Sequence, residues 1–246
     1  MILLVTGGSR GIGAATARLA AARGYDICIN FRSNKDAASR VVSDVEAAGR
    51  RAIAVPADVS VEADVVRLFE TCDRELGRLD ALVNNAAILE KQMRLDAMDA
   101  ARLTRVMSTN VVGPFLCARE AVKRMSTKYG GRGGAIVNVS SGASRLGSPN
   151  EYIDYAASKG ALDTMTTGLA KEVAQEGIRV NAVRAGHVYT ELHASGGEPD
   201  RVERVKHLVA MKRGGQPEEI ARAILWLLSG EASFTTGAFL DVAGGN

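Results

Sequence analysis

The chain has 246 residues, of which 46% are hydrophobic and 24% charged, and its formal net charge at pH 7 is +3. This length and composition are typical of a globular protein that buries a sizeable core. The small net charge and the lack of a Lys/Arg block argue against a nucleic-acid-binding protein. No apolar run approaches the roughly 18 residues that span a bilayer, so we expect no membrane association.

Three cysteines, Cys28, Cys72 and Cys117, lie far apart in apolar stretches. Their spacing fits neither a disulfide framework nor a metal site, so we expect buried, reduced thiols and no metal. The chain also enters an apolar strand without a basic leader. Together these features lead us to expect a cytoplasmic protein.

Apolar strand-like segments alternate with helical patterns along the chain. The predicted strands are 2–5, 26–31, 52–55, 79–83, 134–139, 178–183 and 238–242. The predicted helices are 14–22, 35–48, a third that runs to about 76, 96–128 with an interruption near 110–114, 152–175 and 217–228. Ser60 is expected to cap the third helix, and Trp226 is expected to lie in the core with Ile220, Ala223 and Leu227.

This alternation predicts an α/β fold, a doubly wound, Rossmann-type parallel sheet of about seven strands with helices on both faces. No repeat, linker or low-complexity tract divides the chain, so we expect a single domain, residues 1–246. Ligands of such sheets bind outside the carboxyl ends of the strands. The polar residues that follow the strands, at 6–13, 30–33, 58–59, 84–87, 140–141 and 184–190, should therefore converge on one edge.

Glycines at positions 7, 8, 11 and 13 occupy the turn between the first strand and the first helix. The unpaired N–H groups and the positive end of the helix dipole point at whatever lies above such a turn. Glycines also let a pyrophosphate approach the backbone closely. The turn therefore predicts a dinucleotide cofactor, and the alternative is a glycine-rich turn without a ligand.

The residues after the second strand indicate which dinucleotide binds. An acid there would favour NAD by bonding the ribose 2′-hydroxyl, whereas arginine accommodates a 2′-phosphate. The strand ends in Asn30-Phe31-Arg32-Ser33 without an acid, and Arg10 can reach the same space. Asp36 should lie one helical turn further on. We expect NADP(H) as the preferred cofactor and NAD(H) as the second choice, the alternative being two solvated surface arginines.

Tyr155 and Lys159 are four residues apart and should share one face of a helix. A neighbouring ammonium favours the phenolate, so Lys159 is expected to lower the pKa of Tyr155 from its usual value of about 10. Most Y-x-x-x-K pairs are merely surface neighbours. Here the pair follows a dinucleotide turn, an Asn-Asn-Ala segment and a Ser-Ser strand end, and the combination predicts a catalytic site.

With these motifs the whole chain resembles the short-chain dehydrogenase/reductase (SDR) family. The resemblance rests on 6–13, Asp58, 84–87, Asn110, Ser140 and Ser141, Tyr155, Lys159 and 181–190. It implies NAD(P)(H)-dependent oxidation of alcohols or reduction of carbonyls. Tyr155 is then the acid/base, and Lys159 lowers its pKa and binds the nicotinamide ribose. Ser141, rather than Ser140, orients the carbonyl, and Asn110 holds a water for the proton relay.

The resemblance also implies the cofactor contacts. Asp58 would contact the adenine, Asn85 and Ala86 would line the adenosine side and the nucleotide ribose, and Val188 and Thr190 would lie near the nicotinamide carboxamide. The complete expected set is Gly7, Ser9, Arg10, Gly11, Ile12, Gly13, Asn30, Arg32, Ser33, Asp58, Val59, Asn85, Ala86, Ala87, Tyr155, Lys159, Gly186, Val188 and Thr190.

The chain departs from the family pattern in two places. Ala185 stands where proline is usual, and the loss of a fixed φ should loosen the cofactor loop. Glu151 and Tyr152 lengthen the connection before Tyr155 and could shape the substrate pocket. The two histidines at positions 187 and 193 are expected to lie in a mobile substrate loop, about 187–213, rather than to bind a metal.

The expected function is an NADP(H)-dependent oxidoreductase with a small-molecule carbonyl or alcohol substrate. A 3-oxoacyl thioester and a sugar or polyol both remain open. The alternatives are a non-catalytic NADP(H)-binding sensor or scaffold on the same fold, and an RNA-binding cleft, which the weak charge disfavours. The helical region 111–128 and the helix after Tyr152 carry small or apolar residues on more than one face, such as Ala118, Ala121, Val122, Leu162, Met165 and Leu169. One face should cover the sheet and the other should meet a partner, and the resemblance implies a homotetramer in which these helices pair.

Overall fold

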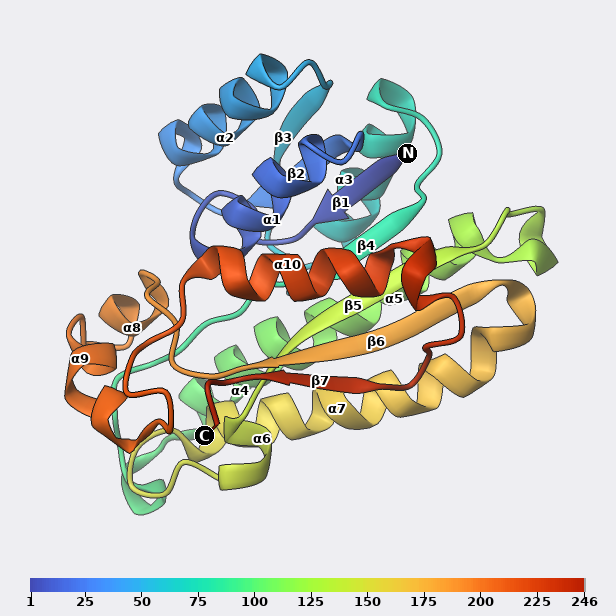
Figure 1. Ribbon diagram of the computed structural model, residues 1–246. Helices are drawn as coiled ribbons and strands as arrows, with labels where there is room; N and C mark the ends of the chain where they lie inside the picture. Colours follow the sequence, from blue (N-terminus) through green and yellow to red (C-terminus); the bar gives the residue numbers. More distant parts are fainter. Residues whose placement is uncertain (246) are drawn as a thin grey trace.

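A computed structural model describes residues 1–245 and contains a seven-stranded sheet in the order β3-β2-β1-β4-β5-β6-β7. Every neighbouring pair of strands is parallel, and the order reverses between β1 and β4 (Figure 1). The predicted doubly wound sheet is therefore confirmed. The strands are β1 (Ile2–Val5), β2 (Asp26–Phe31), β3 (Ala52–Pro56), β4 (Ala81–Asn84), β5 (Gly134–Ser141), β6 (Ile178–Ala185) and β7 (Phe239–Val242).

The long central strands extend further than their apolar runs. β5 and β6 each continue two residues beyond the predicted ends, because their polar ends still pair, Ser140 with Arg184 and Ser141 with Ala185. The extension carries Ser141 to the edge where the other strands end. Parallel pairing thus places the polar ends at the expected edge.

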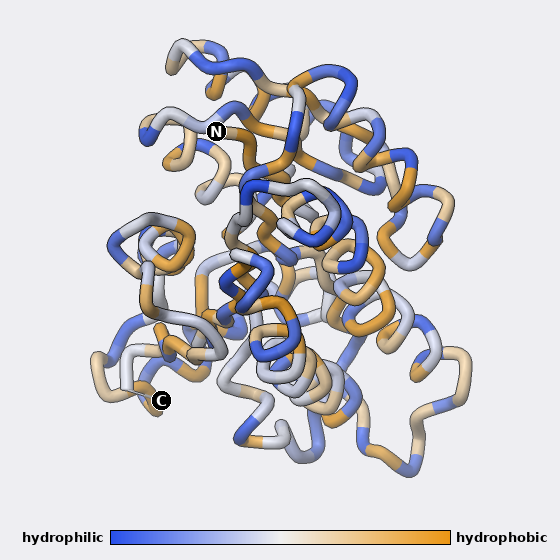
Figure 2. The backbone as a smooth tube through the Cα atoms, turned by 90° about the vertical axis from the view of Figure 1, so that its right-hand side faces the viewer, coloured by the Kyte–Doolittle hydropathy of each residue, from blue (hydrophilic) through white to orange (hydrophobic). Residues whose placement is uncertain are grey.

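Both faces of the sheet are covered by helices. α1 (Gly11–Ala21), α2 (Lys35–Ala47) and α10 (Pro217–Leu228) share one hydrophobic core with Leu3 and Val5 of β1. α3 (Glu62–Glu75), α5 (Gly113–Met125) and α7 (Ile153–Val173) share the other with Ile2 and Leu4. Successive strand residues point to opposite faces, so β1 contributes to both cores. Figure 2 gives the perpendicular view of this arrangement, coloured by hydropathy.

The remaining helices are short and lie mostly near the site. They are α4 (Ala100–Met107), a π-helical turn (Ser108–Val112), α6 (Ala143–Leu146), α8 (Leu192–Ser195), α9 (Arg201–Val205) and 3-10 turns at Leu95–Ala97, Thr127–Tyr129, Ala174–Glu176, Lys206–Leu208 and Gly230–Ala232. The π-helical turn is the predicted interruption of the 96–128 helix. It inserts an irregular turn between α4 and α5, and such turns are frequent at functional sites.

Two local predictions are wrong. Ser60 does not cap α3: its backbone N–H and its hydroxyl both donate to Asp58 Oδ1, at 2.9 and 2.7 Å, and Val61 is the N-cap residue. The Asp58 carboxylate is charged and is therefore a strong hydrogen-bond acceptor for both groups of Ser60. Trp226 is 38% exposed, because the buried side of α10 carries Ile220, Ile224 and Leu228.

The small and apolar residues named on the two helices are mostly covered within the chain itself. Ala118, Leu162 and Met165 are buried against one another between α5 and α7, and Ala121 belongs to the core beneath α5. These four residues therefore belong to the face that packs within the chain. The large apolar side chain that α5 does expose is Phe115.

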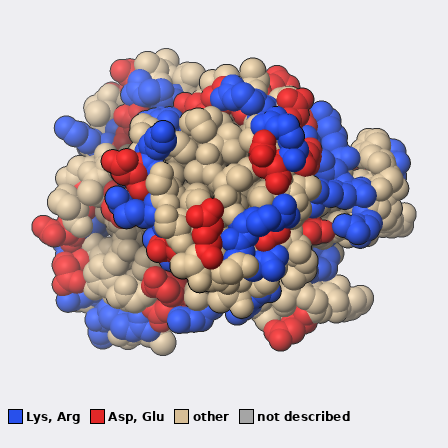
Figure 3. All heavy atoms as spheres, turned by 90° about the horizontal axis from the view of Figure 1, so that it is seen from above, with Lys and Arg blue, Asp and Glu red and all other residues tan. Residues whose placement is uncertain are grey.

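Other sequence-based expectations concern the thiols, the membrane and the surface charge. Cys28, Cys72 and Cys117 are free and buried, as predicted. Among residues 1–245, no helix is both long enough and apolar enough to cross a membrane. Basic and acidic side chains are interleaved on the face seen in Figure 3, in keeping with the small net charge.

Candidate active site

Two adjoining cavities lie at the carboxyl ends of the strands. One, of about 230 Å³, lies above the glycine turn, and the other, of about 360 Å³, contains Tyr155 and Lys159. Ile12, Asn85 and Thr190 line both, so the two cavities form one continuous cleft. Its position is the one expected for the ligand site of a doubly wound sheet.

The glycine turn is shaped for close approach of an anion. Gly7 and Gly11 have left-handed φ angles of 62° and 53°, and a Cβ on Gly13 would lie 2.5 Å from the Gly7 carbonyl oxygen. The first turn of α1 holds no acidic residue, and its N-cap, Arg10, makes no side-chain capping bond. The first amides of α1 and the helix dipole therefore favour a phosphate there.

Thr6 and Asn85 hold this turn against the end of β4. Thr6 Oγ1 accepts hydrogen bonds from the N–H groups of Asn85 and Ala86, at 2.9 and 3.0 Å. The Asn85 amide donates to the carbonyls of Thr6 and Gly7, at 2.9 and 3.1 Å. Thr6 was missing from the expected contacts, although it precedes the glycine motif in the sequence.

Asn30 braces the same turn from β2. Its Oδ1 accepts a hydrogen bond from Gly7 N at 2.9 Å, and its Nδ2 donates to the Ala57 carbonyl at 2.6 Å. The residue is only 2% exposed. Asn30 lines the first cavity, and its polar side-chain atoms connect the glycine turn to the residue that follows β3.

Arg10 and Arg32 are exposed, and both line the first cavity. Ser33 lies beside them, whereas Asn34 caps α2 by accepting a hydrogen bond from Ala37 N at 2.9 Å. The chain therefore presents two guanidinium groups where β2 ends. This arrangement suits a phosphate.

Most of the expected cofactor residues line the cleft. The first cavity is lined by Gly7, Ser9, Arg10, Gly11, Ile12, Asn30, Arg32, Ser33, Asp58, Val59, Asn85, Ala86, Ala87 and Thr190. The second is lined by Tyr155, Lys159, Gly186 and Val188, among others. The lining residues that were not predicted are Phe31, Asn34, Ala57, Ile88, Thr109, Glu191 and Leu192. They flank the predicted segments, and no motif marks them.

Tyr155 and Lys159 lie one helical turn apart on α7, with the Lys159 ammonium 5.5 Å from the centre of the Tyr155 ring. Lys159 Nζ donates to the Val139 carbonyl at 2.7 Å. Burial lowers the pKa of Lys159 to about 8, although the Asp163 carboxylate acts in the other direction. The site therefore holds an ammonium that loses its charge more readily than an exposed lysine does.

The pKa of Tyr155 moves opposite to the expected direction. Burial raises it to about 12, and the neighbouring Ser141 hydroxyl only partly lowers it. The predicted net lowering of the Tyr155 pKa is therefore wrong for this structure, because removing the phenolate from water outweighs the hydrogen bond with Ser141. At neutral pH Tyr155 is a protonated phenol, which is a proton donor.

The two serines at the end of β5 have different partners. Ser140 is buried and donates to Asp163 Oδ1 at 2.6 Å, and Asp163 also accepts from Arg184 Nε at 2.9 Å. Ser141 Oγ accepts a hydrogen bond from Ala143 N at 3.1 Å and lies near Tyr155. The Ser140 hydroxyl is committed to Asp163, and the Ser141 hydroxyl can act beside Tyr155.

Asn110 lies in the π-helical turn and is completely buried. Its Oδ1 accepts from Ile88 N at 2.8 Å, and its Nδ2 donates to the Ile88 carbonyl at 3.0 Å and to Ser158 Oγ at 3.1 Å. The side chain therefore ties the segment after β4 to α7. Both polar atoms of the Asn110 side chain form these hydrogen bonds. They hold in place the segment after β4, which lines the first cavity.

The Ala185-Gly186 segment is held in the sheet. Ala185 is the last residue of β6 and its carbonyl accepts a hydrogen bond from Gly142 N at 3.0 Å. Gly186 N donates to the Val242 carbonyl at 3.0 Å, and a Cβ on Gly186 would lie 2.6 Å from Ala243 Cα. The pairing of β6 with its neighbours and the contact with Ala243 hold this segment in place.

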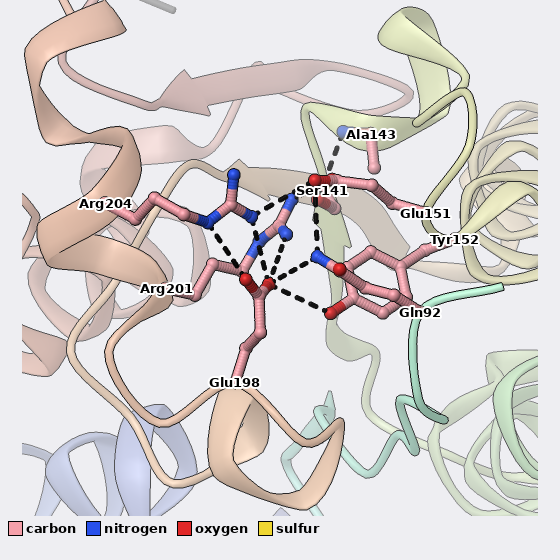
Figure 4. A network of polar contacts seen from close by, with 8 residues as sticks. All are labelled: Gln92, Ser141, Ala143, Glu151, Tyr152, Glu198, Arg201 and Arg204. Atoms are coloured by element: carbon pink, nitrogen blue, oxygen red, sulfur yellow. Dashed lines mark hydrogen bonds and ion pairs between the residues drawn. The ribbon is translucent and has the colours of Figure 1, made fainter.

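A network of charged groups joins the expected substrate loop to the connection before α7 (Figure 4). Arg201 bridges Glu151 and Glu198, its bond to Glu198 Oε2 measuring 2.9 Å. Arg204 donates to Glu198 Oε1 at 2.9 Å and to Glu151 Oε1 at 3.1 Å. Two arginines are thus neutralised by two glutamates at the outer end of the second cavity.

Tyr152 lies beneath this network. Arg201 lies over its ring, 4.8 Å from the centroid, and the Tyr152 hydroxyl donates to Glu198 Oε2 at 3.4 Å. Gln92, from the segment after β4, donates to both glutamates (Figure 4). The Glu151-Tyr152 extension therefore forms part of the cavity wall, as the sequence suggested.

His187 and His193 line the second cavity. Burial and the nearby Arg201 charge lower the pKa of His193 to about 4, so its imidazole is neutral at pH 7. Among residues 1–245, no group of three or more His, Cys, Asp or Glu side chains is placed to hold a metal ion.

Comparison with known proteins identifies the family. Residues 7–246 match the family model described as Enoyl-(Acyl carrier protein) reductase. The chain is 60% identical over 244 residues to "Uncharacterized oxidoreductase YgfF" of Escherichia coli (strain K12), covering 99% of each chain. It is 36% identical over 245 residues to the 3-oxoacyl-[acyl-carrier-protein] reductase of Synechocystis sp., covering 99% of this chain and 96% of the relative.

A solved structure agrees with these sequence relatives. A short-chain dehydrogenase from Burkholderia cenocepacia J2315 in complex with NADP has a TM-score of 0.90 and 32% identity, covering 99% of this chain and 96% of the other. Fold, site and sequence relatives therefore lead to one conclusion: the chain belongs to the short-chain dehydrogenase/reductase family and is an oxidoreductase that acts on CH–OH or carbonyl groups.

Proposed function

We propose that the protein is an NADP(H)-dependent oxidoreductase that interconverts a carbonyl and an alcohol, with Tyr155 as the acid/base. The observation that carries this proposal is the cleft itself. Ser141, Tyr155 and Lys159 line one cavity, which continues into the cavity above the glycine turn. A dinucleotide that binds the turn would extend its reactive end toward Tyr155.

When bound in this cleft, the nicotinamide would supply a hydride to the carbonyl carbon. Tyr155 donates its phenolic proton to the carbonyl oxygen, so the C=O bond becomes CH–OH and the phenol becomes a phenolate. The Ser141 hydroxyl holds the carbonyl oxygen within reach of that proton. Such general acid catalysis contributes on the order of 10²–10⁴-fold to a rate.

Lys159 has two proposed tasks. Its ammonium, fixed by the Val139 carbonyl, bonds the nicotinamide ribose and stabilises the Tyr155 phenolate as it forms. Asn110 holds the segment after β4 beside α7, and we propose that this irregular turn also holds the water that returns a proton to Tyr155. A pKa of about 12 keeps Tyr155 protonated at neutral pH, which favours reduction.

The cofactor-binding residues follow from the first cavity. The amides at the start of α1 would bind the pyrophosphate, Asp58 would contact the adenine, and Arg10 and Arg32 would bind the 2′-phosphate of NADP(H). NAD(H), which lacks that phosphate, is the second choice. The other residues that we propose contact the cofactor are those that the family resemblance implies.

The cavity walls favour an apolar carbonyl substrate, such as a 3-oxoacyl chain, over a sugar or polyol. The apolar side chains that line the second cavity are Leu89, Leu146, Val188, Leu192, Val205 and Leu208. The charged groups at its outer end already bond one another. Sugar hydroxyls placed against the apolar side chains would have no partners, and each unpaired polar group costs about 1–3 kcal/mol.

A substrate panel tests the proposal. Purified protein is mixed with NADPH or NADH and with 3-oxoacyl thioesters, simple ketones and aldoses, and turnover is followed by the nicotinamide absorbance. We expect NADPH-dependent reduction of the apolar ketones or thioesters and no reaction of Tyr155→Phe. Cofactor binding without turnover of any carbonyl or alcohol would favour the alternative, an NADP(H)-binding sensor or scaffold.

We further propose that residues 1–246 form a single domain and that the chain assembles as a homotetramer. The support for assembly is the apolar surface that remains exposed near α5, at Val112 and Phe115. Sedimentation at micromolar concentration tests it: a monomer would contradict the assembly.

A further inference from the structure

A buried ion pair lies at the first turn of α7, one residue before Tyr155. Arg102 Nε donates to Asp154 Oδ2 at 2.7 Å, and Arg102 Nη2 donates to Asp154 Oδ1 at 3.3 Å. The two side chains are 4% and 1% exposed. A charge pair so completely removed from water is stable only when its geometry and its other hydrogen bonds are good.

The remaining hydrogen bonds of this pair reach the site from two sides. Asp154 Oδ1 also accepts from the backbone N–H of Tyr155 at 2.9 Å. The third arm of the Arg102 guanidinium, Nη1, donates to the Lys91 carbonyl at 2.6 Å. The pair therefore joins α4, the segment after β4 and the first turn of α7, which carries Tyr155.

The segment after β4 and α7 are connected again one turn further along α7, where Asn110 bonds both Ile88 and Ser158. Tyr155 therefore lies between two polar connections to one segment. Leu89 of that segment and Tyr155 both line the second cavity. A shift of the first turn of α7 would change the distance from the Tyr155 hydroxyl to Ser141 and to a carbonyl between them.

We propose that Arg102 and Asp154 are positioning residues that fix Tyr155 for proton transfer, an inference that rests on the proposed role of Tyr155. They act through the backbone of α7, not by contact with the substrate. Misplacing a reacting group by about 1 Å can slow a reaction by roughly 100-fold. Loss of the pair should therefore reduce kcat on the order of 10- to 100-fold while NADPH affinity stays the same.

The test compares Asp154→Asn and Arg102→Lys with Arg105→Lys as a matched control. Arg105 is on the same helix and pairs with Glu90 at 2.8 Å, but that pair is partly exposed and its hydrogen bonds do not reach α7. The concentration of folded sites is measured by NADPH titration, and kcat is expressed per site. We expect both test variants to lose kcat and to show a larger solvent deuterium isotope effect, because proton transfer becomes rate-limiting.

A purely structural role would lower the yield of folded sites without changing kcat per site or the isotope effect, and that result would overturn the proposal. If a single variant does not fold, Arg102→Met with Asp154→Leu replaces the pair by apolar groups of similar size, which buried pairs often tolerate. This double variant should fold and still be slow; wild-type kcat would overturn the proposal. If Tyr155→Phe keeps turnover, the proposed function fails and this inference with it.

Discussion

The ammonium of Lys159 lies 5.5 Å from the centre of the Tyr155 ring and is anchored by the Val139 carbonyl. This contact holds the two side chains as a unit on α7, one turn apart. Burial moves their pKa values toward the neutral forms, to about 12 for Tyr155 and about 8 for Lys159. At pH 7 the unit is a protonated phenol beside a mostly charged ammonium.

The pH dependence of reduction should follow Lys159. Because its pKa is about 8, the ammonium is present below pH 8 and is lost as the pH rises through that value. We expect kcat/KM for reduction, which reports the free enzyme, to be constant near neutral pH and to fall above pH 8. Lys159→Met should be slow throughout and lack this fall. A wild-type profile that stays constant well above pH 8 would contradict the assignment.

The cofactor preference should depend on Arg32. A charge-assisted hydrogen bond contributes about 1.5–3 kcal/mol, and exposure at the cavity rim places this one at the lower end, about tenfold in affinity. NADPH should therefore bind about tenfold more tightly than NADH at low salt, and Arg32→Ala should remove most of the difference. The measurement is a fluorescence titration with both cofactors.

Arg40→Ala serves as the control for this prediction, because Arg40 is exposed on α2 and does not line the cavity. It should keep the wild-type preference. A wild-type protein that prefers NADH, or an Arg32→Ala variant that weakens both cofactors equally, would show that Arg32 does not bind the phosphate.

The ion-pair network should govern substrate affinity. Glu151→Gln removes one carboxylate from Arg201 and Arg204, which hold α9 against the connection before α7. A lost charged hydrogen bond of about 1.5–3 kcal/mol, reduced by partial exposure, should raise the substrate KM roughly three- to tenfold. The Kd for NADPH should not change, since Glu151 does not line the first cavity. An unchanged KM would show that the network does not shape the substrate site.

Acid should destabilise the fold through His193. Its pKa is lowered to about 4 by burial and by the Arg201 charge, from an ordinary value of 6.5. The unfolded chain therefore binds a proton first, and stability present above pH 6.5 is lost as the pH falls toward 4. The full effect is on the order of 3 kcal/mol.

Thermal melts between pH 7 and pH 4.5 test this prediction. His193→Asn should show a smaller loss of Tm with falling pH than the wild type. His207→Asn, at an exposed position, should keep the wild-type slope. Equal slopes for all three proteins would contradict a buried neutral imidazole at position 193.

The fold could be predicted from the sequence because its strands are short apolar runs separated by helical patterns, which specify a parallel sheet covered on both faces. The same topology predicts that the site lies at the edge of the sheet where the parallel strands end. The direction of the Tyr155 pKa could not be predicted, because it depends on how much water the folded cavity excludes. The Arg201 and Glu151 contact joins residues 50 positions apart, and no motif marks it.

Asn30 and Trp226 show a second reason why some structural details could not be predicted from the sequence. Both were interpreted from residue type and position, but the role of each depends on which neighbours take up its surface. The Asn30 amide is used by Gly7 and Ala57, and the buried side of α10 is supplied by smaller aliphatic residues. Which neighbours form these contacts is known only from the folded structure.

Single-turnover reduction by Tyr155→Phe tests the role of Tyr155 most directly. The variant is saturated with NADPH, whose binding is checked by fluorescence, and mixed with a carbonyl substrate that the wild type reduces. Because phenylalanine has no proton to donate, we expect NADPH to bind with wild-type affinity and the reduction rate to fall by on the order of 10²–10⁴-fold. A variant that binds NADPH and reduces the substrate within a fewfold of the wild-type rate would contradict the assignment of Tyr155 as the acid.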